Sequence, residues 1–290
     1  MPPPPDTFVW IDQAQRLDLS IERRGQGPTL LMLPALSSIS TLGEMQPLQD
    51  RLSDRFQTVA LDWPGFGTRP RPKRIWDRKA LQTYLDVVLD TVVERPLATL
   101  AAGHAAGYLL DAAMRRPGLA GRLVLLAPTW RGPLPTMMGR RSRLGERVGR
   151  AAEVPLLGSL LYRLNLNPPM VRLMARQHVY TDPTWLSGDR LAAKMRVVNQ
   201  TGARHASLRF VAGLLDPFDD HEAFLTAATL VRDPILVVYG DQAPSKSKAE
   251  MAALSALPHV ETIVLRKGKL ALHEEWPDEV AAAIRPFLSR

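Results

Sequence analysis

The sequence predicts one α/β domain with a mostly parallel central sheet, helices on both faces of that sheet and a helical cap insertion. Short apolar strands alternate with helical patterns on both sides of a single interruption, which is typical of a parallel sheet covered by helices. The chain has 290 residues, enough for one such core and an insertion. Its composition, 46% hydrophobic and 23% charged, is that of a globular protein with a sizeable apolar core.

The N-terminal elements are predicted in chain order. Residues 1–6 include four prolines and are expected to form a disordered arm, with the character of neither a signal nor a transit peptide. Apolar runs at 17–23 and 29–33 flank the turn residues 24–28, which predicts a β-hairpin. The later elements are expected at helix 45–52, strand 56–61, helix 81–93, strand 98–102, helix 106–114, strand 122–126, strand 235–239, helix 248–257, strand 261–265 and helix 277–288.

The interruption divides the chain into a core, expected at 7–130 and 221–290, and a basic helical cap at 131–220. Nine arginines and only two acidic residues lie between Arg131 and Arg176, within a chain of net charge +8. Apolar stretches between those arginines read as basic amphipathic helices. We expect either a lid whose arginines face solvent or a surface for an anionic membrane or an acidic protein partner. Nucleic acid is not expected, because no binding motif accompanies the charge.

Three segments carry a resemblance to a known family. The strand at 56–61 runs into Asp62-Trp-Pro-Gly-Phe-Gly67, residues 100–126 read as a strand, a Gly103-His104-Ala105-Ala106-Gly107 turn, a helix and a strand, and residues 234–288 follow in order. These segments resemble the α/β-hydrolase superfamily at matching places along the chain. The resemblance implies an α/β-hydrolase fold with a variable helical cap after the second of those segments.

The same resemblance implies a Ser-His-Asp triad, and this sequence departs from it at each position. The family's G-x-S-x-G elbow carries the nucleophile, and alignment places Ala105 there, so an acyl intermediate cannot form. The acid aligns with Ala243, although Asp241 is only two residues away. The histidine aligns with Leu270, and His273 matches a second, noncatalytic histidine of the family pattern that we expect to cap the last helix.

The oxyanion loop and the pocket lining are predicted next. The family's His-Gly pair is replaced by Pro34-Ala35, but the amides of Leu36 and Ala106 are still expected to converge as a binding pair for a ligand oxygen. Ser37, Ser38 and Trp130 with Arg131 are candidates for the pocket mouth and lining, although such serines more often satisfy backbone groups. The ligand-binding candidates are thus Leu36, Ser37, Ala105, Ala106 and Trp130.

Other polar residues are interpreted as structural. His104 beside the elbow is expected to pack or to anchor a loop rather than to catalyse. Asp216, Asp219, Asp220 and His221 could suggest a metal site, but a helix start capped by Asp is favoured. No metal or cofactor is expected, and the absence of cysteine excludes disulfides and thiolate chemistry.

Two functions of different class follow. The degenerate triad favours a noncatalytic protein that binds an apolar small molecule under the cap, or a partner or membrane through the basic cap. The alternative is a hydrolase or lyase in which His273 or Asp241 activates water. An engineered serine knock-out is disfavoured because position 270 lacks its histidine as well. We expect a soluble, cytoplasmic protein, and peripheral association with a membrane is the alternative.

Overall fold

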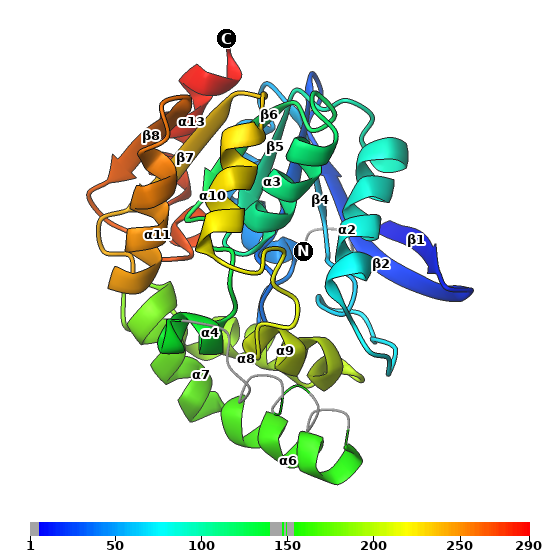
Figure 1. Cartoon of the computed structure of the whole chain (residues 1–290). Helices are drawn as coiled ribbons and strands as arrows, with labels where there is room; N and C mark the ends of the chain where they lie inside the picture. Colours follow the sequence, from blue (N-terminus) through cyan, green and yellow to red (C-terminus); the bar gives the residue numbers. More distant parts are fainter. Residues whose placement is uncertain (1–5, 140–146, 148, 150–153) are drawn as a thin grey trace.

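A computed structural model describes residues 6–139, 147, 149 and 154–290 and places an eight-stranded sheet at the centre of the chain (Figure 1). The strand order is β1-β2-β4-β3-β5-β6-β7-β8, with β3 to β8 parallel and the first two strands antiparallel. The predicted α/β fold with a mostly parallel sheet is confirmed. The strands are β1 (Asp6–Asp12), β2 (Gln15–Arg24), β3 (Thr29–Leu33), β4 (Gln57–Leu61), β5 (Ala98–Ala102), β6 (Arg122–Leu126), β7 (Ile235–Gly240) and β8 (Val260–Leu265).

The N-terminal hairpin differs from the prediction. Strand β2 pairs antiparallel with β1 and β4, whereas β3 lies on the far side of β4 and pairs with it in parallel. The turn residues 24–28 therefore form a crossover connection and not a hairpin, because β4 lies between β2 and β3, the two strands that were expected to pair. The hairpin that the structure contains joins β1 to β2 through Gln13 and Ala14. Both residues have positive φ, a geometry that glutamine and alanine do not predict from sequence. Asp6 belongs to β1, so the expected arm loses its last residue, and residues 1–5 lie outside the described part.

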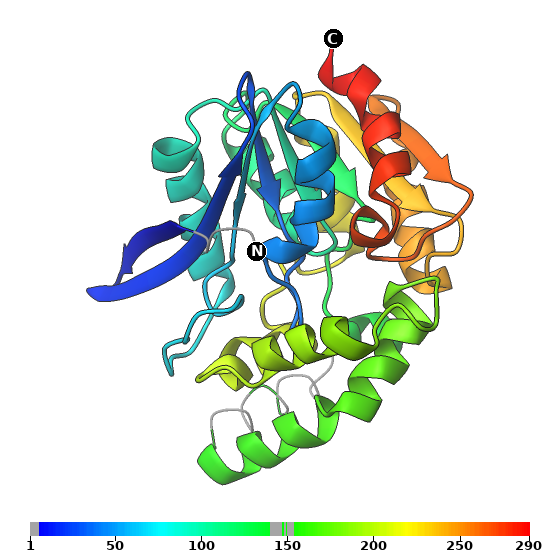
Figure 2. The same cartoon turned by 180° about the vertical axis from the view of Figure 1, so that it is seen from behind.

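Helices cover both faces of the sheet, as expected (Figures 1 and 2). One face carries α2, α3, α10 and α11, and the other carries α1, α12 and α13. The core helices are η1 (Leu42–Met45), α1 (Gln46–Leu52), α2 (Arg78–Val87), η2 (Val88–Val92), α3 (Ala105–Arg115), α10 (His221–Leu230), α11 (Ser245–Ser255), α12 (Leu272–Glu275) and α13 (Pro277–Leu288).

The described residues between β6 and α10 form a separate group of helices at one end of the sheet (Figures 1 and 2). We call residues 131–220 the cap segment. Because the chain leaves β6 at its carboxyl end to enter the cap segment, these helices lie at the sheet edge where ligands usually bind in such folds. No described helix is long and apolar enough to cross a membrane. The cap helices are α4 (Pro133–Met138), α6 (Pro155–Asn165), α7 (Pro168–Met174), η3 (Ala175–Val179), α8 (Gly188–Val198) and α9 (Ala203–Val211).

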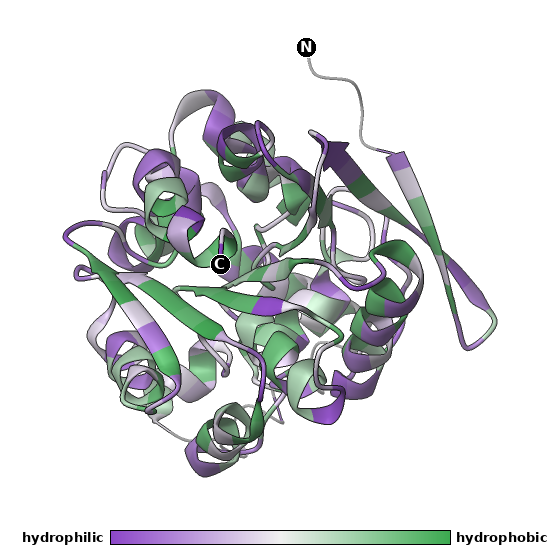
Figure 3. Ribbon diagram, turned by 90° about the horizontal axis from the view of Figure 1, so that it is seen from above, coloured by the Kyte–Doolittle hydropathy of each residue, from purple (hydrophilic) through white to green (hydrophobic). Residues whose placement is uncertain are grey.

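The core lies along the central strands. All residues of β5 and β7, and all of β6 except its first, are buried, because helices shield both sides of a parallel sheet. These strands appear as the apolar centre of the molecule in Figure 3. Each fully buried leucine stabilises the fold by roughly 1.5–3 kcal/mol relative to an exposed one. The sheet is therefore a rigid platform for the loops at its carboxyl edge.

Candidate functional site

The turn between β5 and α3 is the first feature of the site. Strand β5 ends at Ala102, Gly103 has φ +52, and His104 already has helical dihedral angles before α3 begins at Ala105. The nucleophile of a strand-turn-helix elbow occupies the strained residue between strand and helix. That residue is Gly103 here, so the prediction that Ala105 holds the nucleophile position was wrong by two residues. The small residues around it are Ala101 and Ala105, which hid the shift because they also fit the family's spacing.

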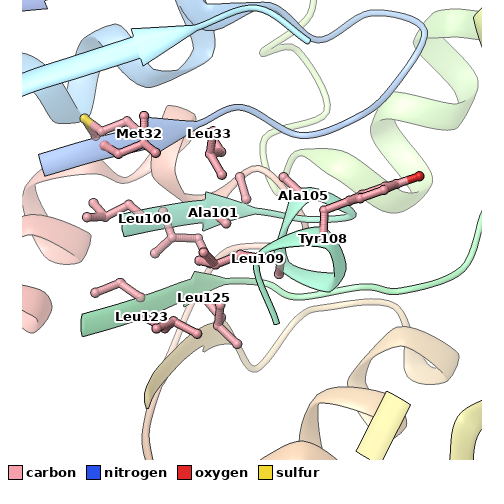
Figure 4. Packing of buried hydrophobic residues seen from close by; sticks show 14 of the residues in the cluster. Met32, Leu33, Leu100, Ala101, Ala105, Tyr108, Leu109, Leu123 and Leu125 are labelled. Carbon is pink, nitrogen blue, oxygen red and sulfur yellow. The ribbon is translucent and has the colours of Figure 1, made fainter. Parts of the chain in front are cut away.

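One side chain crowds the space at the elbow. A Cβ on Gly103 would lie 3.3 Å from the Cβ of Ala35, closer than most side chains approach. Ala105 is fully buried and packs in the core beside Leu33 and Tyr108 (Figure 4). Ala105 therefore does not line a ligand pocket as predicted, since it belongs to the packed interior.

The predicted pair of amides is also different. The N–H of Ala106 donates to the carbonyl of Gly103 at 3.2 Å, so it is not available to a ligand and the prediction for Ala106 was wrong. The amide that follows the elbow residue is that of His104. Among the described residues, the N–H groups of Leu36 and His104 make no backbone hydrogen bond. These two amides are the remaining candidates for binding a negatively charged oxygen.

The His104 side chain is structural. Its Nε2 lies 3.2 Å from the carbonyl oxygen of Leu215 and 3.6 Å from Asp216 Oδ1, and the hydroxyl of Tyr108 donates to the same carbonyl at 2.7 Å. Burial lowers the pKa of His104 to about 4, so its imidazole is neutral at pH 7. His104 thus anchors the elbow to the end of the cap segment, in line with the expected packing role.

The acidic cluster at the end of the cap segment is divided among separate partners. Asp216 Oδ1 accepts from the N–H of Gly132 at 2.8 Å, and Asp220 caps α10 by accepting from Ala223. Asp219 forms an ion pair with Arg78 at 2.6 Å, and His221 Nδ1 lies 2.5 Å from Glu250 Oε2. The predicted Asp N-cap is present, and the described residues contain no group of three acids or histidines placed to hold a metal.

The predicted pocket lining is buried in packing contacts. The ring of Trp130 stacks on Phe224 with centroids 5.8 Å apart, and its Nε1 donates to Glu250. Arg131 pairs with the same Glu250 and lies over the Trp130 ring, so it does not face solvent as a lid arginine would. Trp130 is therefore a core residue between β6 and α10, and not a pocket wall.

The remaining predicted positions are also placed. Ser37 Oγ accepts from the backbone of Ile39 and Ser40, as loop serines often do, and Ser38 is buried. Ala243 is buried and Leu270 is partly buried, so neither supplies a polar group. Asp241 is exposed after β7, and it is not brought near His273 by any described contact.

A buried acid and a buried histidine meet under the cap segment. The Oε1 of Glu44 lies 3.5 Å from His273 Nε2, and both side chains are almost completely shielded from solvent. The same Glu44 oxygen accepts a hydrogen bond of 2.5 Å from the N–H of Ala35, the residue that contacts Gly103. The expectation that His273 caps the last helix was therefore wrong: the buried side chain turns inward, toward Glu44.

Electrostatics hold Glu44 in its charged form. Burial alone would raise its pKa, but His273, Lys194 and the Ala35 N–H together lower that pKa below its usual value. Neither ring nitrogen of His273 has a hydrogen-bond partner among the described residues. The carboxylate of Glu44 approaches Nε2 without a hydrogen bond to it, and Nδ1 has no such neighbour, so an imidazole beside a carboxylate is a candidate general base.

A second layer of charge joins this pair to the cap segment. Lys194 Nζ of α8 lies 3.2 Å from Glu274 Oε1, and the hydroxyl of Tyr180 donates to Glu274 at 2.7 Å. Glu274, Tyr180 and Glu44 raise the pKa of Lys194 although burial opposes them. Glu275 accepts from the N–H groups of Thr181 and Asp182 beside this pair. The cap segment is thus held over Glu44 and His273 by hydrogen bonds and an ion pair.

Open space occurs beside this layer. A hollow of about 390 Å³ lies between the cap segment and α12, and Glu274, Glu275, Trp185 and Arg190 are part of its lining. A smaller one of about 90 Å³ lies beside β1 and α2. Neither hollow is lined by Gly103, Ala105 or Trp130. Glu44 and His273 are not in its lining either, so the hollow adjoins Glu274 and Glu275 and not the buried acid–histidine pair itself.

Sequence reasoning missed Glu44 and Lys194 for identifiable reasons. Thr41 and Glu44 have the spacing of a capping box, which reads as an ordinary helix start. Lys194 shares the buried face of α8 with Leu191 and Val198, and a lysine on an apolar helix face is the one signal that could have been noticed. Their meeting with His273 depends on how the cap segment packs, which no local pattern encodes.

Comparisons with known proteins agree with this fold. A model of the alpha/beta hydrolase family matches residues 30–283. A 2-(acetamidomethylene)succinate hydrolase from Mesorhizobium japonicum is 34% identical over 90 residues, a stretch that covers 31% of this chain and only 29% of that relative.

Solved structures are similar over nearly the whole chain. A bromoperoxidase from Bacillus anthracis has a TM-score of 0.73 at 12% identity, covering 98% of this chain and 100% of its own. An esterase from Thermogutta terrifontis has a TM-score of 0.72 at 18% identity, covering 98% of each chain. At these identities the likeness shows the fold alone.

Proposed function

This chain belongs to the alpha/beta hydrolase family, and we propose that it is a hydrolase that works without a nucleophile on its elbow. One observation carries the proposal: the buried side chains of Glu44 and His273 lie 3.5 Å apart, and the Ala35 amide donates to the same Glu44 oxygen. The sequence relative reported above is named as a hydrolase, which favours catalysis over binding alone. His273 takes the place of the triad histidine, and water takes the place of the serine.

The chemistry balances with water as the nucleophile. The free nitrogen of His273 takes a proton from water as the oxygen attacks a carbonyl carbon, and the carboxylate of Glu44 stabilises the imidazolium that forms. The N–H groups of Leu36 and His104 stabilise the negative oxygen of the resulting tetrahedral intermediate. His273 then returns the proton to the leaving group as its bond to carbon breaks.

Access to the pair requires the cap segment to open. Glu44 and His273 are shielded from solvent. Contacts from the cap segment hold it on the two acids of α12: Glu274 binds Lys194 and Tyr180, and Glu275 binds the amides of Thr181 and Asp182. Substrate binding at the neighbouring hollow would compete with these contacts. Closure over the substrate would then exclude bulk water from the reaction, as lids do in many enzymes.

A second candidate is a noncatalytic binding protein. The observation that favours it is the elbow itself, where Gly103 has no side chain and an added Cβ would lie only 3.3 Å from that of Ala35. In this reading, Glu44, His273 and Lys194 only hold the cap segment in place. The ligand would be an apolar small molecule or a macromolecular surface.

One experiment separates the two. Purified protein is incubated with p-nitrophenyl esters, thioesters, amides and epoxides, beside the variants His273→Gln and Glu44→Gln and the matched control His221→Gln, which changes an exposed histidine. If the protein is a hydrolase, turnover is expected to fall by about 100-fold in His273→Gln and Glu44→Gln and to be unchanged in His221→Gln. If the parent protein turns over no substrate faster than the His273→Gln variant does, and the melting temperatures are preserved, the noncatalytic binding function is the one that remains.

A further inference from the structure

The outer face of α6 is apolar and open to solvent. Tyr162 points inward and donates to the carbonyl of Val198 at 2.8 Å, and Arg204 donates to Ser159, which fixes one face of the helix on the cap segment. Leu156, Leu160 and Leu164 recur every fourth residue and are 87%, 56% and 59% exposed. Four-residue spacing puts these leucines on one side of the helix. The solvent-facing side of α6 is therefore a leucine stripe.

The next helix extends this apolar surface. Val171 of α7 is buried against the cap segment, whereas Leu173 and Met174 are exposed. Asn167 caps α7 by accepting from the N–H of Met170 at 3.0 Å, which fixes the bend between the two helices. In Figures 1 and 2, α6 lies at the outer end of the molecule, on the side away from the sheet. We call the exposed residues of α6 and α7 the leucine-arginine face.

Charge on this face has one sign. Arg163, Arg172 and Arg176 are exposed among these helices and η3, and residues 154–180 contain no aspartate, glutamate or lysine. Exposed leucines flanked by cations without acids are what an anionic lipid surface binds, with leucines entering the headgroup boundary and arginines contacting phosphates. Protein interface cores are enriched in aromatic residues instead, and none of the strongly exposed residues here is aromatic.

We propose that the leucine-arginine face docks this protein peripherally on an anionic bilayer. The proposal is independent of the acid–histidine pair, since it concerns the opposite side of the cap segment. It places the hollow beside Glu274 on a protein held at a membrane surface. Its partner is the lipid itself, bound through aliphatic side chains and arginine and not through a folded headgroup pocket.

The test uses the whole chain and vesicles of defined composition. Co-sedimentation is measured with vesicles of phosphatidylcholine alone and with vesicles containing phosphatidylglycerol, at low and at high salt. Binding is expected only to the anionic vesicles and is expected to weaken in high salt, because exposed charges are screened. The variant Leu160→Ser/Leu164→Ser and the variant Arg163→Glu/Arg172→Glu are each expected to lower the partition coefficient by about tenfold or more.

Matched controls come from the core. Leu230→Ser removes a leucine that is 57% exposed at the end of α10, and Arg232→Glu reverses an exposed arginine near it. Both controls are expected to bind vesicles as the parent does, and thermal melting checks that every variant is folded. Binding that is absent, or equal in the α6 variants and the parent, overturns the proposal. So does sedimentation velocity in which the leucines drive self-association without vesicle binding, since the face would then join copies of the chain.

Discussion

Lys194 of the cap segment and Glu274 of the core form an ion pair that is mostly hidden from solvent, with 3.2 Å between Nζ and Oε1 and side-chain exposures of 11% and 16%. The pair crosses the boundary between the two parts of the fold. Lys194 also brings positive charge near Glu44 and thereby helps to lower the pKa of that carboxyl. Packing of the cap segment and ionisation of the buried acid are therefore linked.

Breaking that ion pair is expected to be costly. Lys194→Met leaves Glu274 and Glu44 shielded without their cation, so the free energy of unfolding should fall by about 3 kcal/mol in urea denaturation. The double variant Lys194→Met/Glu274→Gln should recover part of the loss, because no uncompensated charge remains at the pair. A coupling energy near zero in this double-mutant cycle would mean that the two residues do not act together.

Restoring the sequence motif should not restore a serine hydrolase. Ala105→Ser completes Gly-His-Ser-Ala-Gly, but residue 105 lies in α3 and is buried two residues beyond the elbow. We expect no covalent labelling of this variant by a fluorophosphonate probe, as read by intact mass. Stoichiometric labelling at residue 105 would place the elbow there after all.

The elbow glycine should tolerate no side chain. In Gly103→Ala an alanine must adopt left-handed backbone at φ +52 and bring its Cβ close to Ala35. We therefore expect the free energy of unfolding to fall by about 2 kcal/mol. Gly118→Ala is the matched control, since Gly118 also has positive φ (+80) but an added Cβ would meet nothing within 4 Å. Urea denaturation should find Gly103→Ala the less stable of the two. Equal losses would show that backbone strain alone matters at the elbow.

The sequence predicted the architecture better than the site, for a physical reason. Strands such as 98–102 and 122–126 were predicted to the residue because apolar runs bounded by turns encode them locally. The elbow was misplaced because Ala101, Gly103, Ala105 and Gly107 are all small, and two registers satisfy the same pattern. Only the backbone angle at Gly103 separates them.

Contacts between distant segments could not be predicted from the same patterns. Glu44, Lys194 and His273 come from three regions of the chain. Glu44 and His273 have ordinary local interpretations as capping residues, and Lys194 differs only in lying on an apolar helix face. The hairpin expected at 17–33 failed similarly, because β4 enters between its two strands from farther along the chain. Long-range packing decided each of these outcomes.

The buried His104 should make stability fall in acid. Its folded pKa is about 4 against an ordinary 6.5, so the unfolded chain binds the proton first, and stability is lost as pH falls from about 6.5 toward 4. The full loss is roughly 3 kcal/mol.

Asp62 acts with the opposite sign, because burial raises its pKa to about 6 and its carboxyl favours the folded state when protonated. Comparison with a His104→Asn variant isolates the histidine, since the Asp62 contribution is common to both proteins. Unfolding free energies between pH 4 and 7 should decline more steeply in the parent than in the variant, and parallel curves would mean that His104 is not held neutral by burial.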